Sequence, residues 1–320
     1  MPCKLFPTTI RLLPKQNDNS MFINTTDSTA REKTGSAMQT NSRKPYVVCF
    51  LLTVLSVITP VQADDATRED NEYSTLRNQC YRQDVGGKST RKECQLDLYY
   101  PKHESKFATV VWFHGGGLTG GKRSIPTALM NKGFAVAAVD YRLSPSVMVK
   151  DCIDDAAAAV AWIYRNIESM GGSAERIFVS GHSAGGYLTS MLGYDKSWLG
   201  RYYIDADDLA GLIPYSGHTI THFTARKELG LKKTTPLVDR MAPLYHVRKD
   251  APPTLLITGD RELEMLGRYE ENAYFWRMLK VAGHPSIELF ELDGYNHGQM
   301  AEPAHPLLVR FVRNQLQPSK

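Results

Sequence analysis

The sequence predicts an α/β fold, doubly wound, with a mostly parallel sheet at its centre. Two observations lead to this fold class: short segments that are apolar along their whole length, and helical segments that alternate with them. Continuous apolar character is typical of strands covered on both faces, as in parallel sheets. Long crossovers between such strands are right-handed and place helices on both faces of the sheet.

Strands are expected in series from residue 92 to residue 292. The first, residues 92–100, alternates polar and apolar residues and ends at Pro101. Six apolar strands follow, at residues 108–113, 134–139, 176–179, 209–214, 253–258 and 287–292. The series contains no internal repeat and no linker, so we expect residues 64–320 to form a single domain.

Helices are expected between the strands. Residues 149–170 give the clearest pattern, because apolar residues recur every three or four positions and two glycines then end the helix. Residues 272–282 and 307–316 show the same period.

Two segments after the middle of the chain do not fit this alternation. Residues 194–208 and 218–250 are polar and contain aromatic residues and prolines. They follow sheet strands, where α/β proteins place their ligand crevice. We expect them to form a cap over the site, and the alternative is a plain surface excursion.

The first 63 residues differ in composition from the rest. Residues 1–44 are rich in Asn, Thr, Ser, Lys and Arg, without a sustained apolar period. A basic pair, an apolar run too short for a membrane anchor and a small-residue cleavage site then precede Asp64, as in a secretory signal peptide. Because Met38 opens a conventional leader, we expect a signal peptide at residues 38–63, with residues 1–37 an artefact of the assigned start. The protein is then secreted or periplasmic.

The charge balance limits the classes of partner, and two cysteines are candidates for a disulfide. Residues 1–63 hold seven of the 38 Lys and Arg and three of the 34 Asp and Glu, so residues 64–320 hold 31 of each sign. A near-neutral domain gives no argument for a nucleic-acid partner or an anionic membrane. Cys80 and Cys94 flank an expected hairpin turn, where they either pair in an oxidising compartment or stay as two buried thiols.

The main motif lies at residues 178–188, where an apolar strand runs into Gly-His-Ser-Ala-Gly and then into small helical residues. Gly-x-Ser-x-Gly between a strand and a helix is a nucleophile elbow, in which glycines two residues either way allow the sharp turn. The motif makes Ser183 the candidate nucleophile.

Residues 114–117, His-Gly-Gly-Gly, follow directly on another apolar strand. Backbone N–H groups of Gly115 and Gly116, with that of Ala184, are expected to form an oxyanion hole. A phosphate-binding loop is the rival interpretation of these glycines. It fails because Arg123 stands where that loop needs Ser or Thr for magnesium.

His297 is the best-placed base, since it follows the last expected strand and gives the chain order Ser, acid, His. The acid should lie in the loop after residue 258, where three acids, Asp260, Glu262 and Glu264, compete. The residues alone do not separate the three. His218 and His222 are four apart, but no third zinc ligand is evident and the residues between them are poor helix formers.

Together these motifs make the chain resemble the α/β-hydrolase carboxylesterases, nearest the hormone-sensitive-lipase and acetyl-esterase-like branch. Residues 114–117, residues 140–145 (Asp-Tyr-Arg-Leu-Ser-Pro) and residues 181–186 (Gly-His-Ser-Ala-Gly-Gly) match its signatures in order, within about residues 95–300. The resemblance implies an α/β-hydrolase fold with a small cap inserted after the nucleophile helix. It also implies a structural role for residues 140–145 and for Asp154 and Asp155.

By the same resemblance, the catalytic acid falls three residues after the glycine that ends its strand. Counted from Gly259 this is Glu262, where the family usually has Asp, and the departure leaves Asp260 as the alternative.

The expected function is therefore secreted carboxylic ester hydrolysis, with a triad of Ser183, His297 and Glu262 and no metal or organic cofactor. The expected partner is a small-molecule ester, with no nucleic acid and no stable membrane insertion after signal cleavage. An arylformamidase-like amidase is one alternative. A catalytically inactive, cholinesterase-like binding protein is another, although such proteins have usually lost the serine or the histidine.

Overall fold

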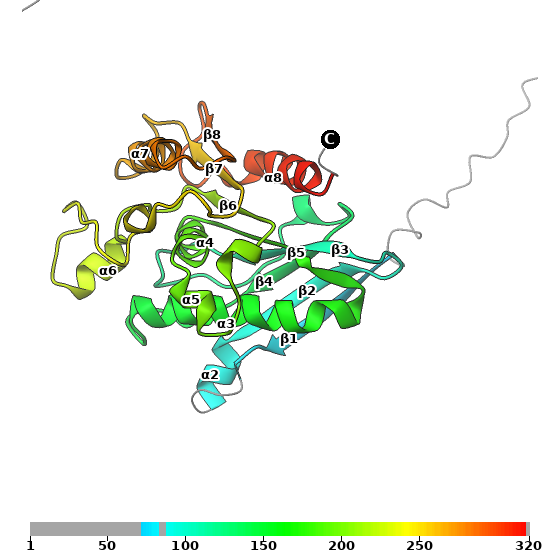
Figure 1. Cartoon of the computed structure of the whole chain (residues 1–320). Helices are drawn as coiled ribbons and strands as arrows, with labels where there is room; N and C mark the ends of the chain where they lie inside the picture. The colour runs from blue at the N-terminus through cyan, green and yellow to red at the C-terminus, as the bar shows by residue number, and fades with distance from the viewer. Residues whose placement is uncertain (1–71, 83–87, 318–320) are drawn as a thin grey trace, which may run out of the picture. The chain divides into compact units, whose positions relative to one another are not determined.

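An eight-stranded sheet lies at the centre of the part of the chain that the computed structural model describes, residues 72–82 and 88–317 (Figure 1). These residues all belong to the unit Pro60–Lys320. The expected signal peptide at residues 38–63 lies outside the described residues. Within them, no helix is long and apolar enough to cross a membrane.

The sheet has the strand order β1-β2-β4-β3-β5-β6-β7-β8. Neighbours from β4 to β8 run parallel, whereas β1 and β2 pair antiparallel and β2 pairs antiparallel with β4. The strands are β1 (Tyr73–Cys80), β2 (Gln95–Pro101), β3 (Phe107–Phe113), β4 (Ala135–Val139), β5 (Gly172–His182), β6 (Gly211–Tyr215), β7 (Thr254–Gly259) and β8 (Ile287–Leu292). All seven expected strands and the mostly parallel sheet are confirmed, and β1 is an addition.

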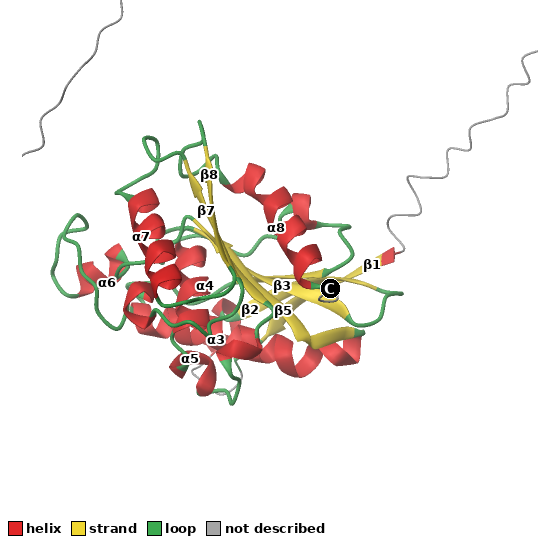
Figure 2. Cartoon of the chain, turned by 45° about the horizontal axis from the view of Figure 1, so that its top comes forward, coloured by secondary structure: helices red, strands yellow, loops and turns green. Residues whose placement is uncertain are grey.

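Helices cover both faces of this sheet, as a doubly wound fold requires (Figure 2). One face packs against α3, α4 and α7, and the other packs against α8. Within β3 the side chains alternate between the two layers: Val111 and Phe113 point to the first and Trp112 to the second. The helices are α2 (Lys88–Glu93), α3 (Val149–Asn166), α4 (Ala184–Tyr194), α5 (Ser197–Gly200), α6 (Phe223–Glu228), α7 (Arg268–Val281) and α8 (Ala301–Gln315).

A buried cluster of charges ties the start of the domain to α3. The fully buried Asp155 accepts hydrogen bonds from Nη1 of Arg82 at 2.7 Å and from Nε and Nη2 of Arg142 at 2.7 and 2.8 Å. Asp154 accepts a second hydrogen bond from Arg82 Nη1 at 2.8 Å. These contacts agree with the structural role that the resemblance implies for the two aspartates.

The cysteines of the described residues, Cys80, Cys94 and Cys152, are all free. The first pair is therefore unpaired, but it does not form the two buried thiols of the alternative expectation, because Cys94 is buried and Cys80 is only partly buried. Burial raises the pKa of Cys94 to about 12, which keeps this thiol protonated.

The two expected cap segments have different surroundings. Residues 194–208 lie against α3: Arg201 contacts Asp154 at 3.2 Å, and Arg165 donates to the carbonyl of Tyr202 at 3.0 Å. Residues 218–250 instead contact the His-Gly-Gly-Gly loop, where Thr224 Oγ1 donates to the carbonyl of Gly117 at 2.6 Å. This second segment therefore reaches the loop that carries two of the expected oxyanion-hole residues.

Candidate active site

Ser183 stands at the junction of β5 and α4. Its backbone has φ 58° and ψ −112°, a conformation that costs a non-glycine residue about 1–3 kcal/mol. A Cβ at Gly185 would lie 2.0 Å from the carbonyl oxygen of Phe113, so only glycine fits there. Ser183 N–H donates to the carbonyl of Tyr215 at 2.8 Å, which fixes the turn to the end of β6. The strand, turn and helix therefore form the elbow that the sequence predicts.

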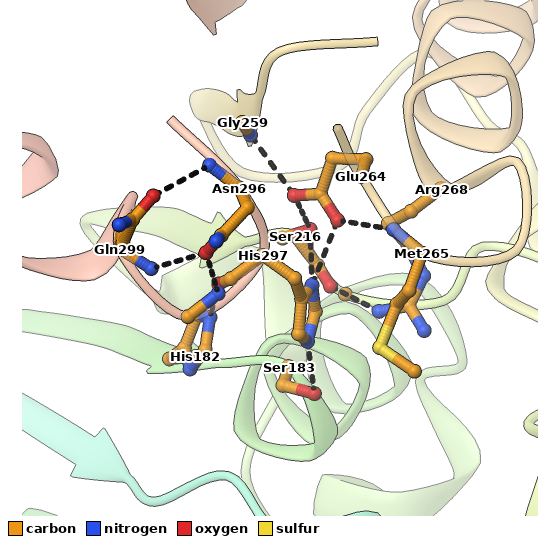
Figure 3. Close-up of polar contacts among 12 residues, drawn as sticks. His182, Ser183, Ser216, Gly259, Glu264, Met265, Arg268, Asn296, His297 and Gln299 are labelled. Carbon is orange, nitrogen blue, oxygen red and sulfur yellow. Dashed lines mark hydrogen bonds and ion pairs between the residues drawn. The ribbon is translucent and has the colours of Figure 1, made fainter. Parts of the chain in front are cut away.

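His297 lies between Ser183 and a carboxylate (Figure 3). Its Nε2 is 2.8 Å from Ser183 Oγ, and its Nδ1 is 2.8 Å from Oε2 of Glu264. A neutral imidazole that donates Nδ1–H to a carboxylate keeps an unprotonated Nε2. This nitrogen can accept the proton of the serine hydroxyl.

The expectation that Glu262 contacts His297 is wrong, because Glu264 occupies that place. The loop makes a turn after β7, with the N–H groups of Leu263 and Glu264 donating to the carbonyl of Asp260. This turn directs Glu264 inward and leaves Glu262 exposed. The count of three residues after Gly259, taken from the family spacing, does not take this turn into account.

Asp260, the alternative acid, also lies elsewhere. Its carboxylate accepts N–H groups of Glu262 and Gly294, both at 2.8 Å, and so closes the loop itself. Glu264 was present among the three acids of this loop, but no local signal in the sequence distinguishes it.

Glu264 has a fully buried side chain with a donor at both oxygens. Oε1 accepts from Ser216 Oγ at 2.5 Å and from Gly259 N–H at 3.0 Å, while Oε2 accepts from His297 and from Met265 N–H at 3.1 Å. Burial raises the pKa of Glu264, but the hydrogen bonds from His297 and Ser216 outweigh burial and lower it to about 2. The carboxylate is therefore ionised at neutral pH.

The glycine loop after β3 lies directly beside the nucleophile. A Cβ built on Gly115 would be 3.4 Å from Cβ of Ser183, and Gly116 has φ 110°, where a side chain would collide with the carbonyl of Gly120 at 2.2 Å. Ala184 is the first residue of α4, so its N–H has no partner within the helix. Of the three expected oxyanion-hole residues, Gly115 thus lies beside Ser183 and Ala184 follows it directly in the chain, while Gly116 is the next residue of the same loop.

A cavity of about 600 Å³ opens on the side of this loop that faces α6. Phe223 lines this cavity and also contacts the loop: its ring lies 3.1 Å from where a Cβ at Gly117 would stand. The cavity is lined by Thr119, Ser144, Pro145, Phe223, Thr224, Lys227, Glu228, Leu231 and Lys233.

His218 and His222, the two histidines weighed as zinc ligands, are both buried. His218 Nδ1 lies 2.8 Å from Oε2 of Glu271, and His222 Nδ1 accepts from Thr224 N–H at 3.1 Å as the N-cap of α6. Burial lowers the pKa of both histidines well below 6.5, so both rings are neutral at pH 7.

Comparison with known proteins gives matches to ester hydrolases. The BD-FAE family model matches residues 96–207. A probable isoprenylcysteine α-carbonyl methylesterase of rice (Oryza sativa subsp. japonica) is 33% identical over 123 residues, which are 37% of this chain and 28% of the rice protein. Ethyl acetate hydrolase of Pseudomonas putida is 30% identical over 154 residues, covering 41% of this chain and 46% of that enzyme. The chain spans less than half the length of these two relatives.

The fold also has solved counterparts. A truncated form of a carbohydrate esterase from gut microbiota superimposes with a TM-score of 0.64 over 77% of this chain and 98% of that one, at 18% identity. At this identity the likeness shows the fold, which is that of the α/β-hydrolases. Over the matched segments, the chain is similar to the BD-FAE family and to curated ester hydrolases, in keeping with the resemblance to carboxylesterases that its motifs give.

Proposed function

We propose that the protein hydrolyses carboxylic esters through an acyl-enzyme formed on Ser183. The hydroxyl of Ser183 attacks the ester carbonyl while His297 accepts its proton at Nε2 and then passes it to the leaving alkoxide. Glu264 holds the Nδ1 proton of His297 and stabilises the imidazolium. Water activated by the same histidine releases the acid and restores the serine.

The amides of Gly115, Gly116 and Ala184 are the proposed donors to the tetrahedral oxyanion. Each donor of this kind is typically worth about 10² to 10³ in kcat, because it meets charge that develops only in the transition state.

One observation carries this proposal: the hydrogen bonds run without interruption from Ser183 Oγ through both nitrogens of His297 to Glu264. The matched relatives, which are named as ester hydrolases, support the same reaction class. A catalytically inactive binding protein has no need of an ionised carboxylate behind a serine–histidine pair.

The test compares two serines, Ser183 just before α4 and Ser190 within that helix. Ser183→Ala should lower turnover of p-nitrophenyl acetate by about 10⁶ and abolish labelling by a fluorophosphonate probe. Ser190→Ala changes a buried serine two turns further along α4 and should keep both activities. Hydrolysis or labelling that survived in Ser183→Ala would refute the assignment.

The substrate is proposed to be a small ester whose larger half extends into the cavity beside Phe223. This cavity combines apolar residues such as Pro145 and Leu231 with polar ones such as Thr119. A screen over acyl chain length and over acetylated or feruloylated sugars identifies the preferred class. Equal rates across the whole screen would speak against a specific pocket.

Export is proposed from the leader pattern at residues 38–63. Expression of the chain from Met38 in a secreting host should yield a mature protein that begins at or near Asp64, as read by N-terminal sequencing. Uncleaved protein retained in the cell would contradict export.

A further inference from the structure

Ser216 lies at the end of β6, between the nucleophile and the acid, and it is fully buried. Its N–H donates to the carbonyl of Ile257 on β7 at 2.7 Å, and its own carbonyl accepts from the guanidinium of the buried Arg268. Its φ is 45°, in the left-handed region that few non-glycine residues adopt. The backbone of Ser216 is thus held from both sides in a strained conformation, and such strain persists only where the surroundings fix it.

The hydroxyl of Ser216 contacts both partners behind the nucleophile (Figure 3). Oγ lies 2.5 Å from Oε1 of Glu264 and 3.2 Å from Nδ1 of His297. An ionised carboxylate only accepts, so the single proton of Ser216 is donated to Glu264. A lone pair of Oγ then faces the Nδ1–H of His297, which is shared between Oε2 at 2.8 Å and Oγ at 3.2 Å.

A glutamate in this place needs such a contact more than an aspartate does. Its side chain has one more rotatable bond, so fixing it in one rotamer costs more conformational entropy. Ser216 and the Gly259 amide hold Oε1, which leaves Oε2 aimed at His297. Hydrogen bonds to ionised groups are roughly twice as strong as neutral ones, so the Ser216 contact is an effective anchor.

We propose that Ser216 is a positioning residue of the active site, which orients Glu264 and His297 together and keeps the proton on Nδ1. This inference rests on the proposed ester hydrolysis, because it assigns Ser216 a part in the reaction of Ser183. Ser216 touches neither substrate nor the reacting atoms, and acts only through its two partners.

Three variants test the inference. Ser216→Ala removes the hydroxyl and keeps the strained backbone, whereas Ser216→Gly removes the hydroxyl and relieves the strain at φ 45°. Ser180→Ala is the matched control, because Ser180 is a fully buried serine of β5 whose hydroxyl donates to the carbonyl of Ile213 at 2.6 Å. Each is measured for kcat and KM on p-nitrophenyl acetate, for active-site titre with a fluorophosphonate, and by NMR of the His297 Nδ1 proton.

Both Ser216 variants should lose about 10- to 100-fold in kcat with KM unchanged, by analogy with the loss when a partner that orients a metal-binding histidine is removed. The active-site titre should equal that of the wild type, because every molecule still folds and reacts with the probe, while its turnover is slower. The Nδ1 proton resonance, assigned by its absence in His297→Gln, should shift in both variants and stay in place in Ser180→Ala.

Several outcomes overturn the inference: wild-type kcat in both variants, recovery of kcat in Ser216→Gly alone, or a titre that falls in step with kcat. The last two would show that backbone strain or folding, rather than the hydroxyl, decides the rate. If the wild-type protein neither hydrolyses esters nor reacts with the probe, the proposed function fails. The NMR signal still decides whether Ser216 orients His297 in that case.

Discussion

The ring of His182 lies against the ring of His297, with centroids 4.9 Å apart, and its Nε2–H donates to the carbonyl oxygen of His297 at 2.7 Å. His182, the residue before Ser183, therefore holds the backbone of His297, the proposed base. Since β5 carries His182 and a loop after β8 carries His297, this contact fixes a loop to the sheet.

The contact predicts different results for two replacements of His182. His182→Leu removes the donor and should lower kcat by about 10-fold, because the His297 loop gains freedom. His182→Gln offers an amide N–H in a similar place and should keep more of the activity. Equal activity in the two variants, measured on p-nitrophenyl acetate, would mean that the hydrogen bond does not position His297.

Acid should destabilise the protein through its buried histidines. Burial lowers the pKa of His182 to about 4 from 6.5, and the unfolded chain takes up its proton first as the pH falls. The free energy of unfolding is therefore highest above pH 6.5 and falls as the pH drops to 4. His182 alone accounts for about 3 kcal/mol of that loss. Burial also lowers the pKa of His114, His218, His222, His284 and His305.

Urea unfolding between pH 7 and pH 4 measures the effect. The free energy of unfolding should decline over that range in the wild type, and decline less steeply in His182→Gln. A flat profile for the wild type would contradict the burial of these rings in neutral form.

The acid of the triad is tested by a pair of glutamates two residues apart. Glu264→Gln should lower kcat by on the order of 10⁴, since the amide cannot fix the Nδ1–H tautomer of His297 as a carboxylate does. Glu262→Gln changes an exposed residue and should leave kcat as it is. Steady-state kinetics on one ester decide the matter, and the reverse order of effects would restore Glu262 as the acid.

Asp155 should matter for stability rather than for chemistry. Asp155→Ala leaves the guanidiniums of Arg82 and Arg142 without the buried carboxylate that pairs with both. Removing one partner of a buried ion pair costs about 3–5 kcal/mol of unfolding free energy. Asp205→Ala is the surface control, since Asp205 pairs with the exposed Lys196 and its loss should change little. Chemical denaturation distinguishes the two variants, and similar midpoints would count against the buried cluster.

The sequence predicted those parts of the fold and site that depend on local patterns. The six apolar strands had to be covered on both faces, and the elbow at Ser183 had its glycines at fixed spacing. The strand β1 was missed because Tyr73–Cys80 is mostly polar and only partly buried, so it shows no apolar alternation. An edge strand needs only backbone pairing with its neighbour.

The triad acid and its support could not be predicted in the same way. Glu264 is selected by a turn at Asp260, and the sequence shows three acids without showing the turn. Ser216 is a common residue at a strand end, and its role follows only from the meeting of β6, the loop after β7 and the His297 loop. Contacts between segments 48 and 81 residues apart leave no local signal.

The cavity beside the glycine loop predicts how substrate size is controlled. Phe223 lines this cavity and contacts Gly117, with its ring also packed on His222 at a centroid distance of 4.4 Å. Phe223→Ala should raise kcat/KM for esters with bulky groups relative to acetate, because losing the ring widens the cavity next to the glycine loop.

The gain should be bounded, because each methylene group gained or lost in an apolar pocket changes selectivity by about 10- to 200-fold. The control is Leu231→Ala in the wall of the same cavity, because the side chains nearest to a Cβ at Gly117 are those of Phe223 and Thr119. The measurement is the ratio of kcat/KM for p-nitrophenyl butyrate and longer esters to that for the acetate. If Leu231→Ala changed this ratio as much as Phe223→Ala, the ring at Gly117 would not be what limits substrate size, and the whole cavity wall would share that role.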